Sequence, residues 1–396
     1  MEKVDNEAEK AAVKTTIDKF LQSFTEKNIK LMKNTLLVII LLFFCGSCSN
    51  YSADKVQNDL DTYFSEQFSE NEPGGAVLVM KGEIILFEKG YGIMDIETKE
   101  KITPETVFNT GSVTKTFVSN GVLILMQEGK LSLDDNIYKN FPGFKNADLA
   151  QQIKIVHLLS HTSGLIDSRD VNANRTFYLT ANDEENFFPI TQNDSLLFAP
   201  GERYQYSNPA FNGLALIIEK VSNTKWRKLI EERIFLPSKM FDSKITDGAF
   251  PQEGVAHGYI KENGVFKEYD YGEVPTFCAA GNGGVWSSVR DLANYELALS
   301  KSVFLDKETL EESRKVYTPE NWNSKEAPGI GYSWFISEVD GLKHVGHTGS
   351  QGGFRCDYVS IPEKELFYVC LCNTPKDTRR FREEVLKILA DNNVLN

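Results

Sequence analysis

The chain has 396 residues, enough for one large domain or two ordinary ones, and its 41% hydrophobic and 25% charged residues are typical of a globular protein. The formal net charge of −13 argues against nucleic-acid binding and against an electrostatic contact with anionic lipid. An acidic surface is common among soluble proteins, so the charge by itself indicates no function.

A short apolar run, Thr35–Phe44, lies near the start of the chain. It has about half of the ~20 residues that a membrane-spanning helix needs. Together with the basic Lys33 before it and small residues and Cys48 after it, the run has the form of a secretory signal and resembles a lipoprotein signal. We therefore predict a lipoprotein-type signal over residues 32–48, with Cys48 lipidated. An uncleaved signal or a buried core helix is the alternative.

Residues 1–31 need a separate explanation, because signals begin proteins. Apolar residues recur there at helical spacing, and the stretch weakly resembles the first helix of a nuclear-transport-factor-like fold. We predict that this stretch is an upstream start-site extension and that Met32 is the real start.

The elements predicted after residue 54 place strands at both ends of the chain and helices between them. The predicted strands are Ala76–Met80, Ile84–Glu88, Gly331–Glu338, Lys343–Gly346, Gly353–Ile361 and Leu366–Asn373. The predicted helices are Lys115–Gly129, Gly213–Lys220, Trp226–Ile234 and Arg380–Asp391. This order predicts one sheet built from the two chain ends, with a mostly helical insertion.

Two cysteines, Cys356 and Cys370, lie in the last two predicted strands, which flank a turn at Pro362. They could face each other, and an exported protein permits a disulfide. Buried free thiols are the alternative.

Ser112 and Lys115 open the longest apolar helix of the chain. Three residues make about one helical turn, so the two side chains share a face. The helix N-terminus offers free backbone N–H groups and stabilises negative charge at the serine. A nearby, partly desolvated lysine can act as a base, or as a cation that lowers a neighbour's pKa. This arrangement is typical of a nucleophilic serine.

The Ser-x-x-Lys spacing alone is a weak signal, since it also occurs at Ser52–Lys55 and Ser222–Lys225. Only Ser112 follows a glycine, Gly111, and precedes a long apolar run. This context favours Ser112 as the nucleophile and the other two copies as chance matches.

The segment 108–117 (FNTGSVTKTF) resembles the nucleophile motif of the serine β-lactamase and penicillin-binding-protein family, especially its class C, DD-peptidase and esterase branches. The resemblance continues in order through 73–77 (PGGAV), 90–92 (GYG), 158–165 (LLSHTSGL), 200–208 (PGERYQYSN), 283–288 (GGVWSS) with Asp291, and 346–350 (GHTGS). It covers nearly everything from residue 54 onward.

This resemblance implies an α+β, β-lactamase/transpeptidase-like fold, with an antiparallel sheet from both chain ends flanked by helices. The hydrolase domain is then expected over 54–396. Its α/β part is expected at about 54–111 and 275–396, and its helical part at about 112–274.

The resemblance also assigns roles within the site. Tyr206 is implied to be the general base, with its phenol kept near an ionisable state by Lys115, because an unperturbed tyrosine of pKa ~10 is a poor base at neutral pH. Asn208 is expected to hydrogen-bond Lys115 or the substrate amide. The segment of His347, Thr348, Gly349 and Ser350 is expected to bind substrate, with the backbone N–H groups of Ser112 and Ser350 forming the oxyanion hole.

His161 is a tempting base, but its segment is a structural turn in the family, so we expect a structural role. No Gly-x-Ser-x-Gly or His-Glu-x-x-His occurs in the chain. His344 and His347, three apart on a strand, would point to opposite faces. The sequence therefore predicts neither a metal nor another cofactor.

The third motif departs from many β-lactamases of the family, which carry lysine where this chain has His347. A histidine of unperturbed pKa ~6.5 is only about a quarter protonated at pH 7, so it attracts a substrate carboxylate weakly. This favours the peptidase and esterase branches. Arg355 could supply the missing charge, although a solvated strand residue is the alternative.

We therefore expect a serine hydrolase that works through a Ser112 acyl-enzyme on an ester or amide: an esterase, a D-amino-acid peptidase or DD-carboxypeptidase, or a weak β-lactamase. The alternative is a non-catalytic, envelope-tethered sensor that binds penicillin or peptidoglycan. The expected partner is a small-molecule or peptide substrate, with membrane contact only through the lipid anchor. The expected location is the cell envelope, as an exported periplasmic or surface lipoprotein.

Overall fold

The computed structural model describes residues 52–169, 183–245, 254–269, 281–323 and 328–395, together with Thr15. The chain divides into two compact units, Met1–Ser52 and Ala53–Asn396, and the second is described below. The predicted signal over 32–48, including Cys48, lies outside the described residues, as does the predicted extension 1–31 apart from Thr15. Within the described ranges, no helix is both long enough and apolar enough to cross a bilayer.

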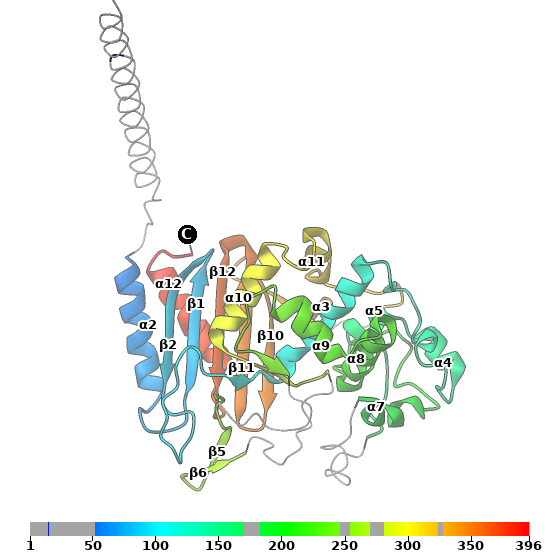
Figure 1. Cartoon of the computed structure of the whole chain (residues 1–396), viewed down its shortest axis with the longest axis horizontal. Helices are drawn as coiled ribbons and strands as arrows, with labels where there is room; N and C mark the ends of the chain where they lie inside the picture. The colour runs from blue at the N-terminus through cyan, green and yellow to red at the C-terminus, as the bar shows by residue number, and fades with distance from the viewer. Residues whose placement is uncertain are drawn as a thin grey trace, which may run out of the picture. The chain divides into compact units, whose positions relative to one another are not determined.

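A seven-stranded antiparallel sheet forms the centre of this unit, in the order β2-β1-β12-β11-β10-β9-β8 (Figure 1). Its strands are β1 (Gly75–Lys81), β2 (Ile84–Tyr91), β8 (Gly329–Ile330), β9 (Phe335–Val339), β10 (Leu342–Gln351), β11 (Phe354–Ile361) and β12 (Leu366–Cys372). The two chain ends meet where β1 pairs with β12, with Leu78 opposite Val369. The sheet predicted from both chain ends is therefore confirmed.

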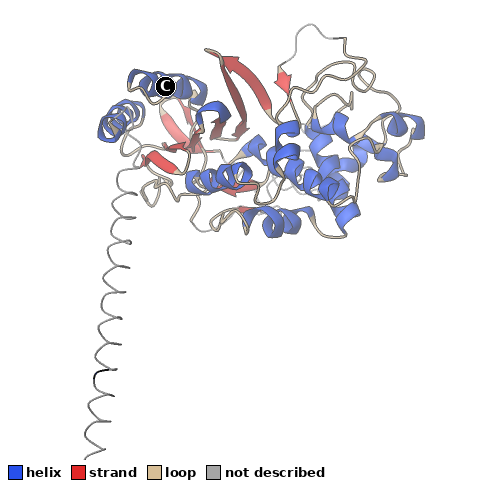
Figure 2. Ribbon diagram, turned by 90° about the horizontal axis from the view of Figure 1, so that it is seen from above, coloured by secondary structure: helices blue, strands red, loops and turns tan. Residues whose placement is uncertain are grey.

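Helices cover both faces of the sheet (Figure 2). The helices α2 (Ala53–Gln67) and α12 (Thr378–Asp391) pack on each other and against β2 and β11. The helix α10 (Val289–Ser300) packs against β1 and β12 on the opposite face. Because both faces are covered, every residue of β12 is buried, which explains its nearly continuous apolar sequence.

The helical part of the fold lies between the two groups of strands in the sequence. Its helices are α3 (Thr114–Gln127), α4 (Ala147–Gln152), α5 (Ile155–Leu159), α7 (Asp183–Thr191), α8 (Asn208–Ser222) and α9 (Trp226–Ile230). The central α3 packs against α8 and α9 and buries nearly its whole surface. A small sheet of β3 (Phe108–Asn109), β7 (Val285–Ser287) and β4 (Lys244–Ile245) lies in the segments that flank this part, and β5 (Tyr259–Glu262) pairs with β6 (Val265–Glu268).

Three of the described helices that lie outside the predicted helical part were absent from the sequence prediction. The helix α2 buries only Val56, Leu60 and Phe64, which are spaced four residues apart, and most of its other residues are polar. Such a narrow stripe hardly differs from a polar loop in composition, and it becomes a helix because it packs on the sheet. The other two unpredicted helices are α10 and α11 (Lys307–Ser313).

Several predicted elements have different bounds in the structure, and the helix predicted as Gly213–Lys220 begins at Asn208 as α8. The predicted strand Gly331–Glu338 is interrupted, so that β8 ends at Ile330 and β9 begins at Phe335. The predicted helix Trp226–Ile234 ends as α9 at Ile230 and continues as a π-helical turn, Glu231–Phe235. The predicted strand Lys343–Gly346 continues through the third motif to Gln351, because pairing with β11 holds that polar segment extended.

The cysteines of β11 and β12 are free and buried. Cys356 lies opposite Leu371 in the register and Cys370 lies opposite Asp357, so the two thiols point to opposite faces. The disulfide considered for this pair is therefore excluded, and the free-thiol alternative is correct. The neighbour of Cys370 is Cys372 on the same strand, with 3.7 Å between the sulfur atoms.

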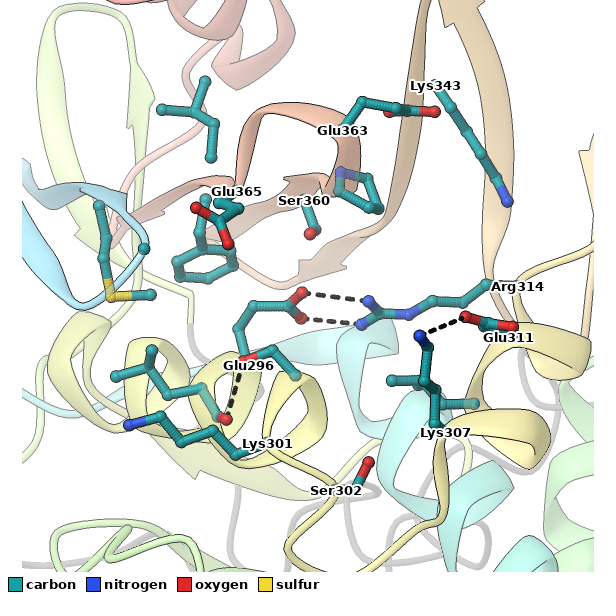
Figure 3. A pocket seen from close by; sticks show the side chains of 18 of the residues that line it. Glu296, Lys301, Ser302, Lys307, Glu311, Arg314, Lys343, Ser360, Glu363 and Glu365 are labelled. Atoms are coloured by element: carbon teal, nitrogen blue, oxygen red, sulfur yellow. Dashed lines mark hydrogen bonds and ion pairs between the residues drawn. The ribbon is translucent and has the colours of Figure 1, made fainter.

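A cavity of about 880 Å³ lies between the end of α10, the helix α11 (Lys307–Ser313) and the edge formed by β10, β11 and β12 (Figure 3). None of the site residues predicted from the sequence lines it. A buried ion pair lies at its wall, where Arg314 donates two hydrogen bonds to Glu296, at 3.1 and 2.8 Å. Tyr358 donates a further hydrogen bond to Glu296.

We expect Arg314→Met to lower the free energy of unfolding by about 3–5 kcal/mol, because it leaves the Glu296 charge buried without its partner. Urea denaturation would measure the loss. The control is Lys307→Met, which removes the exposed pair of Lys307 with Glu311 at 3.7 Å and should cost less than about 1 kcal/mol. Equal losses in the two variants would contradict this account.

Candidate active site

Ser112 lies in the 3₁₀ turn Gly111–Val113, which leads directly into α3. Gly111 has a φ of 53°, in the left-handed region that favours glycine, and this turns the chain from β3 into the helix. Ser112 itself is only partly buried. The turn therefore presents its hydroxyl at the start of a helix that is otherwise packed in the core.

Lys115 is fully buried in the first turn of α3. Its Nζ lies 3.1 Å from Ser112 Oγ and donates to the Asn282 carbonyl oxygen at 2.7 Å. No carboxylate lies within ion-pair distance of this amine among the described residues. Burial, and secondly the Arg169 cation, hold the pKa of Lys115 well below its usual value. A neutral amine next to Ser112 can accept its proton.

Tyr206 lies just before α8, with its hydroxyl in hydrogen-bonding reach of Ser112. The Lys115 amine is 5.0 Å from the centre of the Tyr206 ring. Although Tyr206 is 37% exposed, partial desolvation of its phenol raises its pKa, and the hydrogen bond to Ser112 offsets this only in part. The free enzyme therefore holds Tyr206 as a neutral phenol, whereas the sequence analysis expected it near ionisation. The catalytic role assigned to Tyr206 stays a prediction.

Asn208 is the first residue of α8, and Ser207 caps this helix by accepting from the Ala210 N–H at 3.2 Å. Within the part of the chain that the structure describes, the Asn208 side chain makes no hydrogen bond to Lys115. The carbonyl of Asn282 occupies that position instead. Of the two roles expected for Asn208, contact with the substrate amide stays a prediction.

The third motif lies on β10, directly against the nucleophile turn. A Cβ on Gly349 would lie 1.9 Å from the Thr110 carbonyl oxygen, and one on Gly111 would lie 2.7 Å from Ser350 N. These two glycines allow the backbones of β10 and the Ser112 turn to touch. The N–H groups of Ser112 and Ser350 thus come from adjoining backbone segments, as an oxyanion hole requires.

His347 is buried on β10, with its ring centre 6.4 Å from that of Tyr206 and 5.0 Å from that of Phe335. Its Nδ1–H donates to the Thr348 carbonyl oxygen at 2.7 Å. Burial and the nearby Lys115 lower the pKa of His347 to about 3. The imidazole is therefore neutral at pH 7, and it attracts a carboxylate even less than the sequence analysis expected.

The acceptors of the Arg355 guanidinium are neutral carbonyl groups, so they do not cancel its charge. The guanidinium donates to the carbonyl oxygens of Gly352, at 2.9 Å, and Phe354, at 2.6 Å. It therefore braces the turn between β10 and β11. It is only partly exposed, so a freely solvated strand residue does not describe it, and the supply of charge to the third motif stays a prediction.

His161 supports Tyr206 from the side of the helical part. Its ring stacks on the Tyr206 ring, with 4.4 Å between the centres and 24° between the planes. Nδ1 accepts the Ser207 backbone N–H at 2.9 Å, and burial holds the pKa of His161 well below its usual value. His161 is thus a neutral packing partner and is not placed as a base, which agrees with the structural role expected for it.

Sequence reasoning missed three polar residues that are linked to Lys115 by hydrogen bonds: Asn282, Asn212 and Arg169. Asn282 and Asn212 are buried and joined by a hydrogen bond of 3.0 Å, and Arg169 donates to Asn212 at 2.8 Å. Neither their spacing nor their composition distinguishes them from surface residues. Across the described ranges, no group of three or more histidine, cysteine, aspartate or glutamate side chains could hold a metal ion.

A family model described as Beta-lactamase matches residues 55–392. The chain belongs to the beta-lactamase family. Penicillin-binding protein 4* of Bacillus subtilis (strain 168) is 26% identical over 342 residues, covering 83% of this chain and 74% of that protein. Protein flp of Staphylococcus aureus (strain MW2) is 32% identical over 209 residues, covering 51% of this chain and 41% of that protein.

Solved structures of the beta-lactamase fold superpose on most of the chain. The octameric penicillin-binding protein homologue from Pyrococcus abyssi has a TM-score of 0.69 and 29% identity, over 80% of this chain and 73% of that one. The D-amino acid amidase from Ochrobactrum anthropi SV3 has a TM-score of 0.70 and 21% identity, over 85% and 98%. The predicted fold class is confirmed, and membership of the beta-lactamase family supports an activity of the serine hydrolase type.

Gly349→Ala tests the contact between β10 and the nucleophile turn. Because the new Cβ would collide with the Thr110 carbonyl oxygen, we expect the oxyanion hole to open and the acylation of Ser112 to slow by roughly 10²–10³-fold. The rate of labelling by a fluorophosphonate would measure this. The control is Gly341→Ala, in open space at the other end of β10, which should leave the labelling rate unchanged. An unchanged rate in Gly349→Ala would refute the assignment.

The low pKa of His347 predicts a pH dependence of stability. The unfolded state takes up a proton near pH 6.5 and the folded state only near pH 3, so stability falls as the pH drops below 6.5. Between pH 7 and pH 5 the wild type should lose about 2 kcal/mol more than His347→Gln. Urea denaturation at the two pH values would measure the difference. Parallel losses in the two proteins would show that His347 titrates normally.

Proposed function

We propose that this protein is a serine hydrolase that cleaves an ester or amide bond through an acyl-enzyme on Ser112. The observation that carries the proposal is the buried Lys115 amine, 3.1 Å from Ser112 Oγ and without a carboxylate partner among the described residues. A lysine with a lowered pKa can act as a base at neutral pH.

In the acylation step, the Ser112 hydroxyl gives its proton to the Lys115 amine as Oγ attacks the carbonyl carbon. The oxyanion is held by the backbone N–H groups of Ser112 and Ser350. The Tyr206 hydroxyl, which is neutral in the free enzyme, donates its proton to the leaving group as the scissile bond breaks. The Lys115 ammonium stabilises the phenolate that this leaves, across the 5.0 Å to its ring.

Deacylation reverses these transfers. A water molecule gives a proton to the Tyr206 phenolate and attacks the acyl carbon, and Ser112 Oγ leaves with the proton of Lys115. Each group returns to its starting state, so no further acid or base is needed. This assigns Lys115 and Tyr206 paired roles as base and acid.

The substrate we propose is a neutral ester or amide rather than a β-lactam that depends on its carboxylate. A neutral His347 offers little attraction to such a carboxylate. The likeness to the D-amino acid amidase fold supports an amide, including a D-amino-acid peptide, as one candidate. We place the protein in the cell envelope, exported and anchored through a lipid on Cys48.

Intact mass after exposure to a fluorophosphonate, and separately to a penicillin, tests the proposed function. We expect a fluorophosphonate adduct that is lost in Ser112→Ala. The matched control is Ser222→Ala in another Ser-x-x-Lys copy, where Lys225 pairs with Glu219 at 3.0 Å. This variant should still form the fluorophosphonate adduct on Ser112. A stable penicillin adduct would favour a peptidase. Saturable ligand binding with neither adduct nor turnover would instead establish the non-catalytic sensor.

A further inference from the structure

Arg169 is a buried arginine beside the active site, with only 7% of its surface exposed. Its Nε and Nη2 each donate to the Asp167 carboxylate at 2.8 Å. Its Nη1 donates to the side-chain oxygen of Asn212 on α8 at 2.8 Å and also to that of Asn186 on α7. The guanidinium is therefore fixed on three sides by acceptors from different segments.

A chain of hydrogen bonds leads from this guanidinium to the catalytic amine. The Asn212 amide donates to the Asn282 side-chain oxygen at 3.0 Å, and the Asn282 backbone carbonyl accepts from Lys115 Nζ at 2.7 Å. Asn212 is 2% exposed and Asn282 is 9% exposed. Because these side chains are shielded from water, the orientation of each one depends on its hydrogen-bond partner in the chain. Charges also act over longer distances there than in water.

We propose that Arg169 is a positioning residue for the hydrolytic reaction, which keeps the Lys115 amine uncharged and aims it at Ser112 through Asn212 and Asn282. This inference rests on the proposed function, in which Lys115 removes the serine proton. Arginine suits the task because it stays charged when buried and its planar fork can bind several acceptors at once.

Among the described residues, the other titratable groups that face Lys115 carry no charge that would replace Arg169. Tyr206, before α8, is a neutral phenol, and burial keeps His161, after α5, and His347, on β10, neutral as well. After burial itself, the Arg169 cation is the second cause that lowers the pKa of Lys115. Asp167, whose side chain is 41% exposed, partly neutralises that cation.

The two members of this ion pair should therefore act on Lys115 in opposite directions. Arg169→Gln removes the positive charge, so the pKa of Lys115 should rise and the acidic limb of kcat/KM should move to higher pH. Asp167→Asn removes the carboxylate that partly neutralises Arg169, so the pKa of Lys115 should fall. A purely structural disturbance would lower activity at every pH without moving the limb.

The direct measurement is an NMR titration of the Lys115 Cε signal in protein labelled with ¹³C-lysine, assigned by its absence in Lys115→Arg. Arg169→Lys keeps the charge and should leave the pKa of Lys115 within a few tenths of a unit of wild type. Arg290→Gln, an arginine paired with Glu88 and Glu105 outside the site, is the matched control and should change nothing.

An unchanged pKa of Lys115 in Arg169→Gln, or the same shift in Arg169→Lys as in Arg169→Gln, would overturn the proposal. Should Arg169→Gln fail to fold, Asp167→Asn decides the question by the direction in which it shifts the pKa of Lys115. A rise in that pKa, or no change, would refute the proposal. The titration needs no turnover, whereas the proposed function stands or falls on the Ser112 adduct. Failure of one can therefore be told from failure of the other.

Discussion

A lysine amine taken fully out of water is the constraint on which the arrangement of this protein depends. Lys115 belongs to the first turn of α3, and nearly every residue of that helix is buried. Desolvation disfavours the charged form of an amine, and in the described chain no carboxylate opposes this effect. The carbonyl of Asn282 satisfies the amine with a hydrogen bond and leaves it uncharged. The same packing that stabilises the helical part thus produces a base.

The site exists only where distant parts of the chain meet. Ser112 and Lys115 come from the start of α3, Tyr206 precedes α8, Asn282 precedes β7 and Ser350 lies on β10. The pairing of β1 with β12 joins strands from opposite ends of the domain's sequence. Gly349 lets β10 touch the Ser112 turn. A shift of that one strand by a residue would place a side chain where only a glycine fits.

Electrostatically, the interior around Ser112 differs from the acidic molecule as a whole. Both histidines near the reacting hydroxyl are neutral, and the cation that lowers the pKa of Lys115 among the described residues is Arg169, itself bound to Asp167. A site of this kind favours proton transfer between neutral partners. The charge that this transfer creates is stabilised when the substrate is bound, because the oxyanion hole then holds the negative oxygen. It also offers little attraction to a charged substrate, in keeping with a neutral ester or amide.

The sequence by itself determined the fold family and the sheet built from both chain ends, and it predicted Ser112, Lys115, Tyr206 and the 347–350 segment as site residues, whose roles stay predictions. These features are local, since each depends on a short run of residues with a recognisable order or hydrophobic pattern. It did not reveal α2, whose three buried residues become a stripe only against the sheet, or Asn282, which acts through a backbone carbonyl without a side-chain signature. The protonation states of Lys115, Tyr206 and His347, the support of Tyr206 by His161 and the link to Arg169 were decided by the tertiary structure. Burial and contacts between segments far apart in sequence set these properties, and no residue pattern records them.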